Sequence, residues 1–564
     1  MFSSFRLSMT WLHTWFGLVL GYVLMVVFFF GTLSVFDREI DRWAIPATRF
    51  EPQPMPSFDK MLAPIFRQIT PEDEELDAAR RRVGGPLPAT LPLMNWSAYT
   101  THRDPVLSLY AEFAVTNNPS DPDDHVHGHV TIDPRDGRVL PHDQLKIGSE
   151  FFYPMHYSLH LDWKNLGYWI VGLAALVMLA ALVSGVVMHR KIFRELFTFR
   201  PGKHTRRSVL DLHNLTGVVA LPFHFVFALS GLTIFAGIYL PVSQTVLEPM
   251  ARQHAIAEAK ATGLAFKPAG VAAPLASVDA MVLEAKRRWQ ARGMPGEVGY
   301  LSINHVGDAN SYVSIYRAGS DRVALVGQAV HFEGPTGRVI REEPPPGVIT
   351  GINEFLTGLH LQHFEHWLLR WLYVLGGLAG CACIATGFVF FVEKRRKQHA
   401  QAGMGGARWA DTLAVTAVTG MVVAALAILV ANRMLPAGLA HRGDWERGVF
   451  WGTWLLAFGH AAWRTGALRE ARIAPAWREQ CMAIAVLAVA AVGLNWVSTG
   501  DHLIRTLSAG YWPVAGLDLA LLVSAAIAVF AARRLRLREQ GRAGAAPRER
   551  DGPGAATDPE VAGA

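Results

Sequence analysis

The chain has 564 residues, of which 51% are hydrophobic and only 18% are charged, and its formal net charge is +6. This composition excludes a chain of ordinary soluble globular domains and indicates a membrane protein. The three cysteines, Cys381, Cys383 and Cys481, all lie in apolar runs, so a disulfide framework in the outer segments is excluded as well.

Eight apolar runs are long enough to cross a bilayer, which takes about 20 residues. They lie near residues 11–36, 167–189, 208–240, 366–392, 409–431, 448–464, 480–498 and 513–533. The first run is too long and too aromatic for a signal peptide and lacks a small-x-small cleavage site, so we expect it to remain as a helix. The sequence therefore predicts an α-helical polytopic membrane protein with about eight spans.

Basic residues predict the orientation of these spans. Residues 190–207 contain seven Lys or Arg, residues 394–408 contain five, and the chain after the last run continues as RRLRLRE. The positive-inside rule places these segments on the cytoplasmic side of the membrane. Both termini are then cytoplasmic, and residues 37–160 and 241–360 lie on the outer side. The net charge reflects this bias, so it predicts no nucleic-acid partner.

A repeat with an offset of 200 residues runs through the first part of the chain. LHTWFG at residues 12–17 returns as LHNLTG at 212–217, and VTIDPRDGRVL at 130–140 returns as VHFEGPTGRVI at 330–340. SLHLDW likewise returns as GLHLQH. Each copy consists of a span, a small outer α/β domain and a second span. This pattern predicts an internal parallel duplication about a pseudo-two-fold axis along the membrane normal.

These patterns divide the chain into nine segments. They are span 1 at 8–36, outer domain 1 at 37–160, span 2 at 161–189, a basic cytoplasmic loop at 190–207, span 3 at 208–240, outer domain 2 at 241–360, span 4 at 361–392, four additional spans at 409–533, and a disordered cytoplasmic tail at 534–564. The tail is rich in Gly, Ala, Pro and charged residues, which is typical of disorder.

Four histidines occupy matched positions in the two copies. His13 and His213 each lie about one and a half turns into a span that starts inside, and His160 and His360 each lie just before a span that starts outside. Neutral imidazole is a common metal ligand, and two imidazoles from separate helices can hold a non-covalent haem. No CxxCH motif for covalent attachment occurs. We predict two b-type haems, one ligated near each membrane face, that pass electrons across the bilayer; a packing role for the four residues is the alternative.

Other residues extend or compete with this ligand set. The alternative ligands are His224, His189, His156 and His363. His224 lies about three turns beyond His213 on nearly the same helix face, so it can sit between the haems or ligate one of them. The small residues Gly17, Gly217, Gly31 and Gly231 are expected to give a flat porphyrin room against the helices.

Three more histidines alternate along a predicted strand in DDHVHGH. His125, His127 and His129 therefore share one face of that strand. The second copy has ALVGQ at this place, which favours a solvated edge over a site that binds iron or copper transiently.

With these motifs in view, residues 8–395 resemble the PepSY-associated transmembrane family, often described as iron-regulated membrane proteins. That family includes inner-membrane ferric-siderophore reductases that hold b-type haem through histidines and whose PepSY domains face the periplasm. The resemblance implies that His13, His213, His160 and His360 are haem ligands, and that the two outer domains are PepSY-like. Reduction of a ferric chelate by electron transfer would need no general acid or nucleophile, so no catalytic side chain is predicted.

The expected function is transfer of electrons from a quinol or a cytoplasmic donor to a ferric siderophore or another ferric chelate in the periplasm, which releases the iron. The sequence has no GxGxxG after a strand and no P-loop, and no cytoplasmic domain large enough for a flavin or nicotinamide. Two alternatives remain open. One is a transporter for a siderophore or metal chelate, and the other is a PepSY-type sensor or scaffold without redox activity.

Overall fold

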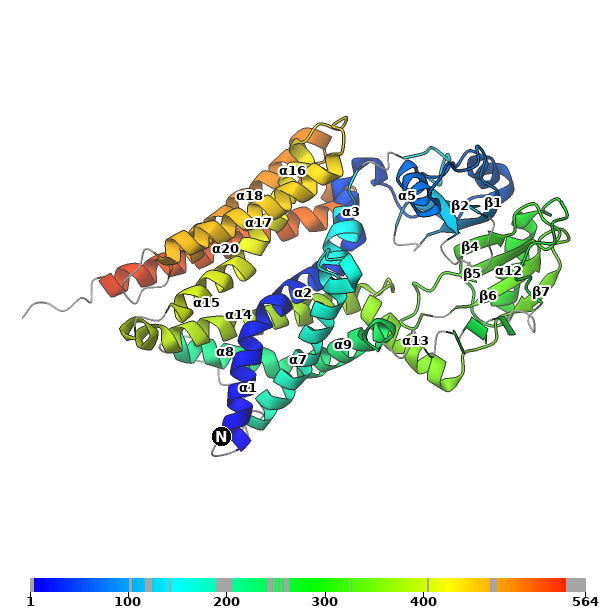
Figure 1. The fold of residues 1–564 in the computed structure, drawn as a ribbon. Coiled ribbons are helices and arrows are strands. Elements are labelled where there is room, and N and C mark those ends of the chain that lie inside the picture. The colour runs from blue at the N-terminus through cyan, green and yellow to red at the C-terminus, as the bar shows by residue number, and fades with distance from the viewer. Residues whose placement is uncertain are drawn as a thin grey trace, which may run out of the picture.

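A computed structural model gives the fold of this chain. It describes residues 5–100, 104–116, 124–140, 144–188, 205–240, 246, 249–250, 252–253, 256–257, 263–325, 327–402, 405–466 and 474–543. Most of the described residues are helical, and an antiparallel sheet lies to one side of the helices (Figure 1).

The helices form an N-terminal group and a C-terminal group. The N-terminal group is α1 (Phe5–Val19), α2 (Gly21–Ser34), α3 (Asp37–Ala44), α6 (Tyr153–Tyr157), α7 (Leu166–Met188), α8 (Thr205–Val219), α9 (Leu221–Ile234), α10 (Ala236–Tyr239), α13 (Val348–Leu361) and α14 (Trp367–Gln401). The C-terminal group is α15 (Gly406–Val415), the π-helical turn η6 (Thr416–Gly420), α16 (Met421–Met434), α17 (Arg442–Gly466), α18 (Pro475–Thr499), α19 (Leu503–Ser508) and α20 (Trp512–Ala543). In the N-terminal group α1 packs against α7, and α8 packs against α14.

The described helices contain five to seven candidate membrane spans. Five are single helices, at Trp163–Met188, Trp367–Arg395, Gly406–Met434, Pro475–Thr499 and Trp512–Leu537, and two more are bent pairs. The prediction of a polytopic helical membrane protein is thus confirmed, whereas the count of eight is not reached. The expected span at 448–464 lies within α17, whose first two turns are charged. Helix α20 also continues to Ala543, past residue 534 where the tail was expected to begin.

The first and third expected spans are each a bent pair of helices. The pair α1 and α2 is bent by 60°, and the pair α8 and α9 by 62°. Pro222 stands in the first turn of α9, and a proline there cannot continue the hydrogen-bond ladder of a preceding helix. At the other bend Gly21 begins α2, and a Cβ on it would lie only 3.0 Å from Phe388.

The segments at residues 37–160 and 241–360 share one antiparallel sheet. Its strands are β1 (Leu93–Tyr99), β2 (Leu107–Ala114), β3 (His125–Ile132), β4 (Val298–Asn304), β5 (Tyr312–Arg317), β6 (Ala329–Glu333) and β7 (Val339–Glu342), in the order β3-β2-β1-β4-β5-β6-β7. Strands β1 and β4 pair from Asn95 opposite Asn304 to Tyr99 opposite Tyr300. The sequence predicted two small α/β domains, and in the structure their strands join edge to edge in one sheet of seven strands.

Helical segments also pack on this sheet. They are the π-helical turn η2 (Phe58–Leu62), α4 (Ala63–Phe66), α5 (Asp73–Val83) and α12 (Val278–Ala291). Two of them, η2 and α12, connect the two halves of the sheet. Asp59 at the start of η2 accepts hydrogen bonds from Ser277 Oγ (2.6 Å) and Val278 N–H (3.1 Å) at the start of α12. Asp279 in turn accepts one from Phe58 N–H (2.7 Å). Each half therefore supplies a carboxylate that satisfies unpaired N–H groups at the other half's helix start.

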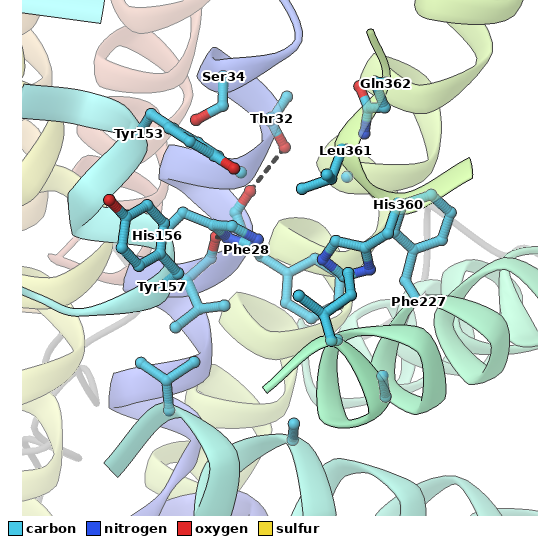
Figure 2. A pocket seen from close by; sticks show the side chains of 18 of the residues that line it. Phe28, Thr32, Ser34, Tyr153, His156, Tyr157, Phe227, His360, Leu361 and Gln362 are labelled. Atoms are coloured by element: carbon cyan, nitrogen blue, oxygen red, sulfur yellow. Dashed lines mark hydrogen bonds between the residues drawn. The ribbon is translucent and has the colours of Figure 1, made fainter. Parts of the chain in front are cut away.

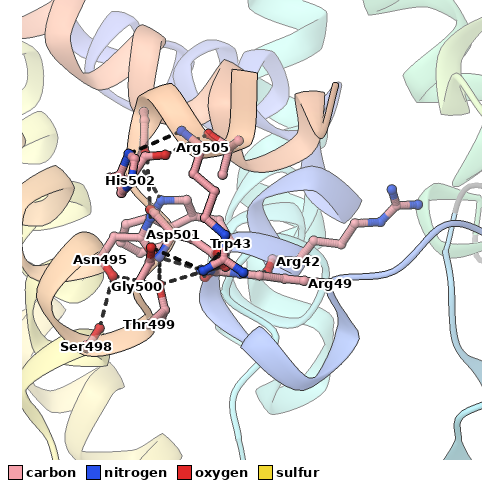
Figure 3. A network of polar contacts seen from close by, with 12 residues as sticks. Arg42, Trp43, Arg49, Asn495, Ser498, Thr499, Gly500, Asp501, His502 and Arg505 are labelled. Carbon is pink, nitrogen blue, oxygen red and sulfur yellow. Dashed lines mark hydrogen bonds and ion pairs between the residues drawn. The ribbon is translucent and has the colours of Figure 1, made fainter. Parts of the chain in front are cut away.

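A polar network ties the segment after α3 to the C-terminal helices (Figure 3). The Arg49 guanidinium donates to Asn495 Oδ1 (2.8 Å), to Asp501 Oδ2 (2.8 Å) and to the Trp43 carbonyl (2.6 Å). The Trp43 indole in turn donates to Asp518 Oδ1 (2.8 Å) on α20. Buried charges persist where such hydrogen bonds satisfy them. The C-terminal group is therefore fixed to α3 and the segment that follows it.

Candidate functional site

Two histidines from separate spans face one another in the helical region. His13 of α1 and His213 of α8 have ring centroids 6.1 Å apart, with ring planes at 86°. His13 Nδ1 lies 3.0 Å from the Ala181 carbonyl of α7, and His213 Nδ1 lies 2.8 Å from the Cys383 carbonyl of α14. A carbonyl oxygen only accepts, so both Nδ1 atoms carry the hydrogen and both Nε2 atoms carry the lone pair. We call these residues the inner pair.

A second pair has the same ring separation. His156 of α6 and His360 of α13 have ring centroids 6.1 Å apart, with ring planes at 32°. His156 Nδ1 donates to the Val27 carbonyl (2.8 Å). His360 Nδ1 donates to Ser230 Oγ (2.9 Å), whose own hydrogen is donated to the Val226 carbonyl. Both rings thus have the same tautomer as the inner pair. We call them the outer pair.

In the two halves of the chain, the backbone groups that bond to the histidine rings lie at equivalent positions of the repeat. The His156 ring bonds to the backbone of Val27, and the His360 ring also bonds to the backbone of Phe227, which lies 200 residues further along. In the inner pair, the acceptors Ala181 and Cys383 are likewise at corresponding points of α7 and α14. His156, and not His160, is therefore the residue that takes the place of His360 in the first half.

A glycine lies against each ring. A Cβ added to Gly31 would come within 2.6 Å of His156, and one on Gly231 within 3.0 Å of His360. A Cβ on Gly185 or Gly387 would lie 3.4 Å from His13 or His213, respectively. Because a Cβ contact below 3.0 Å forces a neighbour to move, Gly31 allows the approach of His156 to α2. On α1, by contrast, a Cβ at Gly17 would meet nothing within 4 Å.

Burial keeps the outer rings neutral. The pKa of His360 is lowered to about 3, chiefly because burial removes the hydration of the imidazolium form and also because His156 is close. Burial lowers the pKa of His156 for the same reason. Both rings therefore carry no charge near neutral pH, and neutral imidazole is the form that ligates metals.

A cavity opens beside the outer pair. It lies between α2, α6, α7, α9 and α13, and Figure 2 shows His156 and His360 on opposite sides of it. Tyr153 and Tyr157 line the side of His156, and Gln362 lines the side of His360. The cavity thus combines apolar walls with a few polar groups, which is the usual makeup of a site for a cofactor or small ligand.

The structure does not bring His160 and His360 together, although the repeated LH motif predicted it. Helix α6 ends at Tyr157, and Leu159 and His160 then have positive φ values of 54° and 53°. This turn directs the His160 ring onto Phe151, where it stacks at 4.8 Å and bonds through Nε2 to the Phe151 carbonyl (2.9 Å). Helix α13 instead continues through His360 to Leu361.

The remaining candidates lie in different surroundings. His224 bonds through Nε2 to the Gly376 carbonyl (3.2 Å) and packs edge-on against Phe28 at 5.1 Å. The bend between α8 and α9 also means that it shares no straight helix face with His213. His363 lines the cavity from the segment after α13, and His189 lies outside the described residues.

The groups that orient the rings could not be identified from the sequence. Ser230 stands directly before Gly231 in the repeated motif, but nothing in the sequence relates it to His360. The carbonyls of Val27 and Ala181 belong to the backbone, so their positions depend on helix packing and leave no residue signature.

Comparison with known proteins places these helices in a family context. The family model described as "PepSY-associated TM region" matches residues 10–394. A relative from Pseudomonas aeruginosa strain PAO1, described as the uncharacterized protein PA4219, is 27% identical over 399 residues, which cover 66% of this chain and 92% of that protein. The matched range of the family model contains both histidine pairs and ends before α15.

Proposed function

We propose that this chain, which belongs to the PepSY-associated transmembrane family, holds two b-type haems and transfers electrons to a ferric siderophore or another ferric chelate. The observation that carries the proposal is the occurrence of two histidine pairs with the same 6.1 Å ring separation. A metal–imidazole bond of about 2 Å puts two rings that ligate one ion from opposite sides roughly 6 Å apart between centres. Both pairs have this spacing.

The surrounding residues fit a haem in three respects. All four rings have an acceptor at Nδ1, and the Nδ1–H tautomer that this favours would leave each Nε2 lone pair available to a metal. The ligands of each pair come from different helices, as in other helical haem proteins. Open space in front of Gly17, one turn beyond His13, leaves room for a flat ring. When bound, haem iron supplies one-electron redox chemistry.

The protein's own residues then have separate tasks. The inner pair, His13 and His213, would hold one haem on the side of a quinol or cytoplasmic donor. The outer pair, His156 and His360, would hold the other beside the cavity, and Tyr153 and Gln362 are placed to contact what enters there. One electron from the donor converts Fe(III) of the chelate to Fe(II), which binds hard oxygen ligands more weakly and is released. This transfer requires no nucleophile and no general acid from the chain.

The proposed topology rests on the distribution of basic residues along the chain. The chain would cross a bacterial inner membrane eight times with both termini in the cytoplasm, since the basic segments favour that side. The sheet region would face the periplasm and correspond to two PepSY-like domains that arose by a parallel duplication. Supporting this duplication, corresponding backbone groups 200 residues apart orient His156 and His360.

A dithionite-reduced minus oxidised spectrum of the protein purified in detergent tests the proposal, with haem quantified per chain. We expect two low-spin b haems per chain, and His13→Ala or His213→Ala should remove the inner one. Reduced protein mixed with a ferric chelate should then reoxidise as a ferrous trap captures iron. Absence of haem from protein made with ample haem supply would reject the proposal and favour a chelate transporter, or a sensor without redox activity.

A further inference from the structure

A cluster of metal-binding side chains lies at one end of the sheet, away from both histidine pairs. His125 and His127 alternate along β3, so they share one face of that strand. Glu112 of β2 stands directly opposite His127 in the strand register. One ligand atom from each of these three residues lies within 4.8 Å of the others. The ring centroids of the two histidines are 4.9 Å apart.

Neighbouring side chains hold the three groups in place. Asn95 Nδ2 donates to Glu112 Oε2 (2.6 Å), while Glu112 Oε1 lies 3.6 Å from His125 Nδ1. Glu75 of α5 accepts the backbone N–H of His127, and its Oε2 also lies 3.2 Å from His127 Nδ1. A carboxylate on Nδ1 fixes the tautomer that leaves Nε2 as the metal-binding nitrogen, which is the usual support of a ligating histidine.

We infer that Glu112, His125 and His127 bind a divalent transition-metal cation such as Zn²⁺ in the outer domain. Two imidazoles and one carboxylate suit zinc and ferrous iron, and catalytic or exchangeable sites use three protein ligands with a further position open to solvent. The side chains of His125 and Glu112 are 31% and 27% exposed, so a cation can reach them from solution. Small side-chain rotations bring the ligand atoms to the roughly 3.3 Å spacing of a tetrahedral site.

Among the described residues, this three-residue cluster occurs in the first half of the repeat. Strand β3 is the terminal strand of the sheet formed by the described residues, whereas its counterpart β6 is covered by β7. At the corresponding places the second half has Leu325 and Gly327. Charged and polar side chains at a sheet edge also prevent edge-to-edge association, and that role alone would need no metal. The experiment must therefore separate metal binding from edge protection.

Zinc titration of the full-length protein in detergent makes this separation. After treatment with a chelator, wild-type protein and variants are titrated with Zn²⁺ by calorimetry, and bound zinc is counted after dialysis. We expect His125→Ala, His127→Ala and Glu112→Gln each to lose one Zn²⁺ per chain. Glu75→Gln should retain the site but bind about 10- to 100-fold more weakly, because it loses only the orienting carboxylate.

His129→Ala is the matched control. His129 lies on the same strand and face, but its ring stacks on Tyr110 at 4.5 Å outside the three-residue cluster. Its zinc content should equal that of the wild type. Equal zinc binding by the wild type and the His125 and His127 variants would overturn the inference, and so would an equal loss in the His129 variant.

The result does not depend on bound haem. An unchanged elution volume and an unchanged circular dichroism spectrum confirm that the variants are folded.

Discussion

The inner and outer histidine pairs have the same ring separation of 6.1 Å but are built from different elements. The inner rings both come from the first helix of a bent span, and both bond to carbonyls of a long apolar helix. The outer rings come from the five-residue α6 and the 14-residue α13. Their planes are at 32°, where those of the inner pair are at 86°.

This difference shows that a repeated sequence motif identifies structurally equivalent residues only when both copies lie in the same kind of secondary structure. In the inner pair each LH motif lies inside a regular helix, so equal sequence position gives equal position in space. In the outer pair one copy of the motif lies beyond the end of a helix. Residues past a helix end no longer follow the 3.6-residue period, and His160 is thereby turned away. The residue of the first half that is structurally equivalent to His360 is therefore His156, which lies four residues before His160.

Replacement of the two competing outer histidines is the sharpest test of this comparison, and it has the largest expected effect. His156→Ala should remove the outer haem and leave about one haem per chain, because it deletes a ring 6.1 Å from His360. His160→Ala should retain both haems, since that ring bonds to the Phe151 carbonyl. Haem quantified per chain, with the low-spin signals resolved by electron paramagnetic resonance, measures both. The reverse pattern would restore the pairing predicted from the LH motif.

Much of the helical architecture could be predicted because hydrophobic run length is a direct consequence of bilayer thickness. The repeat also predicted that His13 and His213 correspond, and the structure places them side by side. The bend at Gly21 could not be predicted, because nothing in the sequence relates Gly21 to Phe388, which lies against it from a distant helix. Nor could the pairing of β1 with β4, since backbone hydrogen bonds between strand edges have no residue signature.

Glycine replacements should lower the haem content of the two pairs to different degrees. The expected order follows the distance between the added Cβ and the histidine ring. Gly31→Ala places a Cβ 2.6 Å from His156, so we expect it to displace that ring and lower outer haem occupancy strongly. Gly231→Ala, at 3.0 Å from His360, should have a smaller effect, and Gly185→Ala, at 3.4 Å from His13, the smallest. Haem content per chain and the reduced spectrum measure this order.

The control for this series is Gly452→Ala in α17, where a Cβ meets nothing within 4 Å. It should match the wild type. Alanine is also the better helix former by about 1 kcal/mol, so a loss of haem in the Gly31 variant cannot come from weaker helix propensity. If Gly31→Ala binds haem as the wild type does, the close approach of His156 to α2 is not required for the outer site.

The smallest expected effect concerns the hydrogen bonds that orient the rings. Ser230→Ala removes one of the two acceptors around His360 but keeps the bond to the Phe227 backbone. An acceptor on Nδ1–H makes the ring a stronger electron donor and stabilises Fe(III), so its loss should raise the midpoint potential of the outer haem. A net hydrogen bond of about 0.5–1.5 kcal/mol corresponds to about 20–60 mV for one electron.

Redox titration of Ser230→Ala and Ser184→Ala compares how far each serine shifts the midpoint potential of its own haem. The two variants differ in the acceptors that remain around the ring. Ser184 Oγ lies 3.3 Å from His13 Nδ1, but the Ala181 carbonyl at 3.0 Å is the closer acceptor and remains in the variant. The inner potential should therefore move less than the outer one. In each variant the haem of the unaltered pair should keep its potential, because neither serine contacts the other pair's rings through these bonds. Equal shifts of the midpoint potential in both variants would contradict this expectation. They would mean that the two serines affect their haems equally, although the inner and outer pairs are built from different helices.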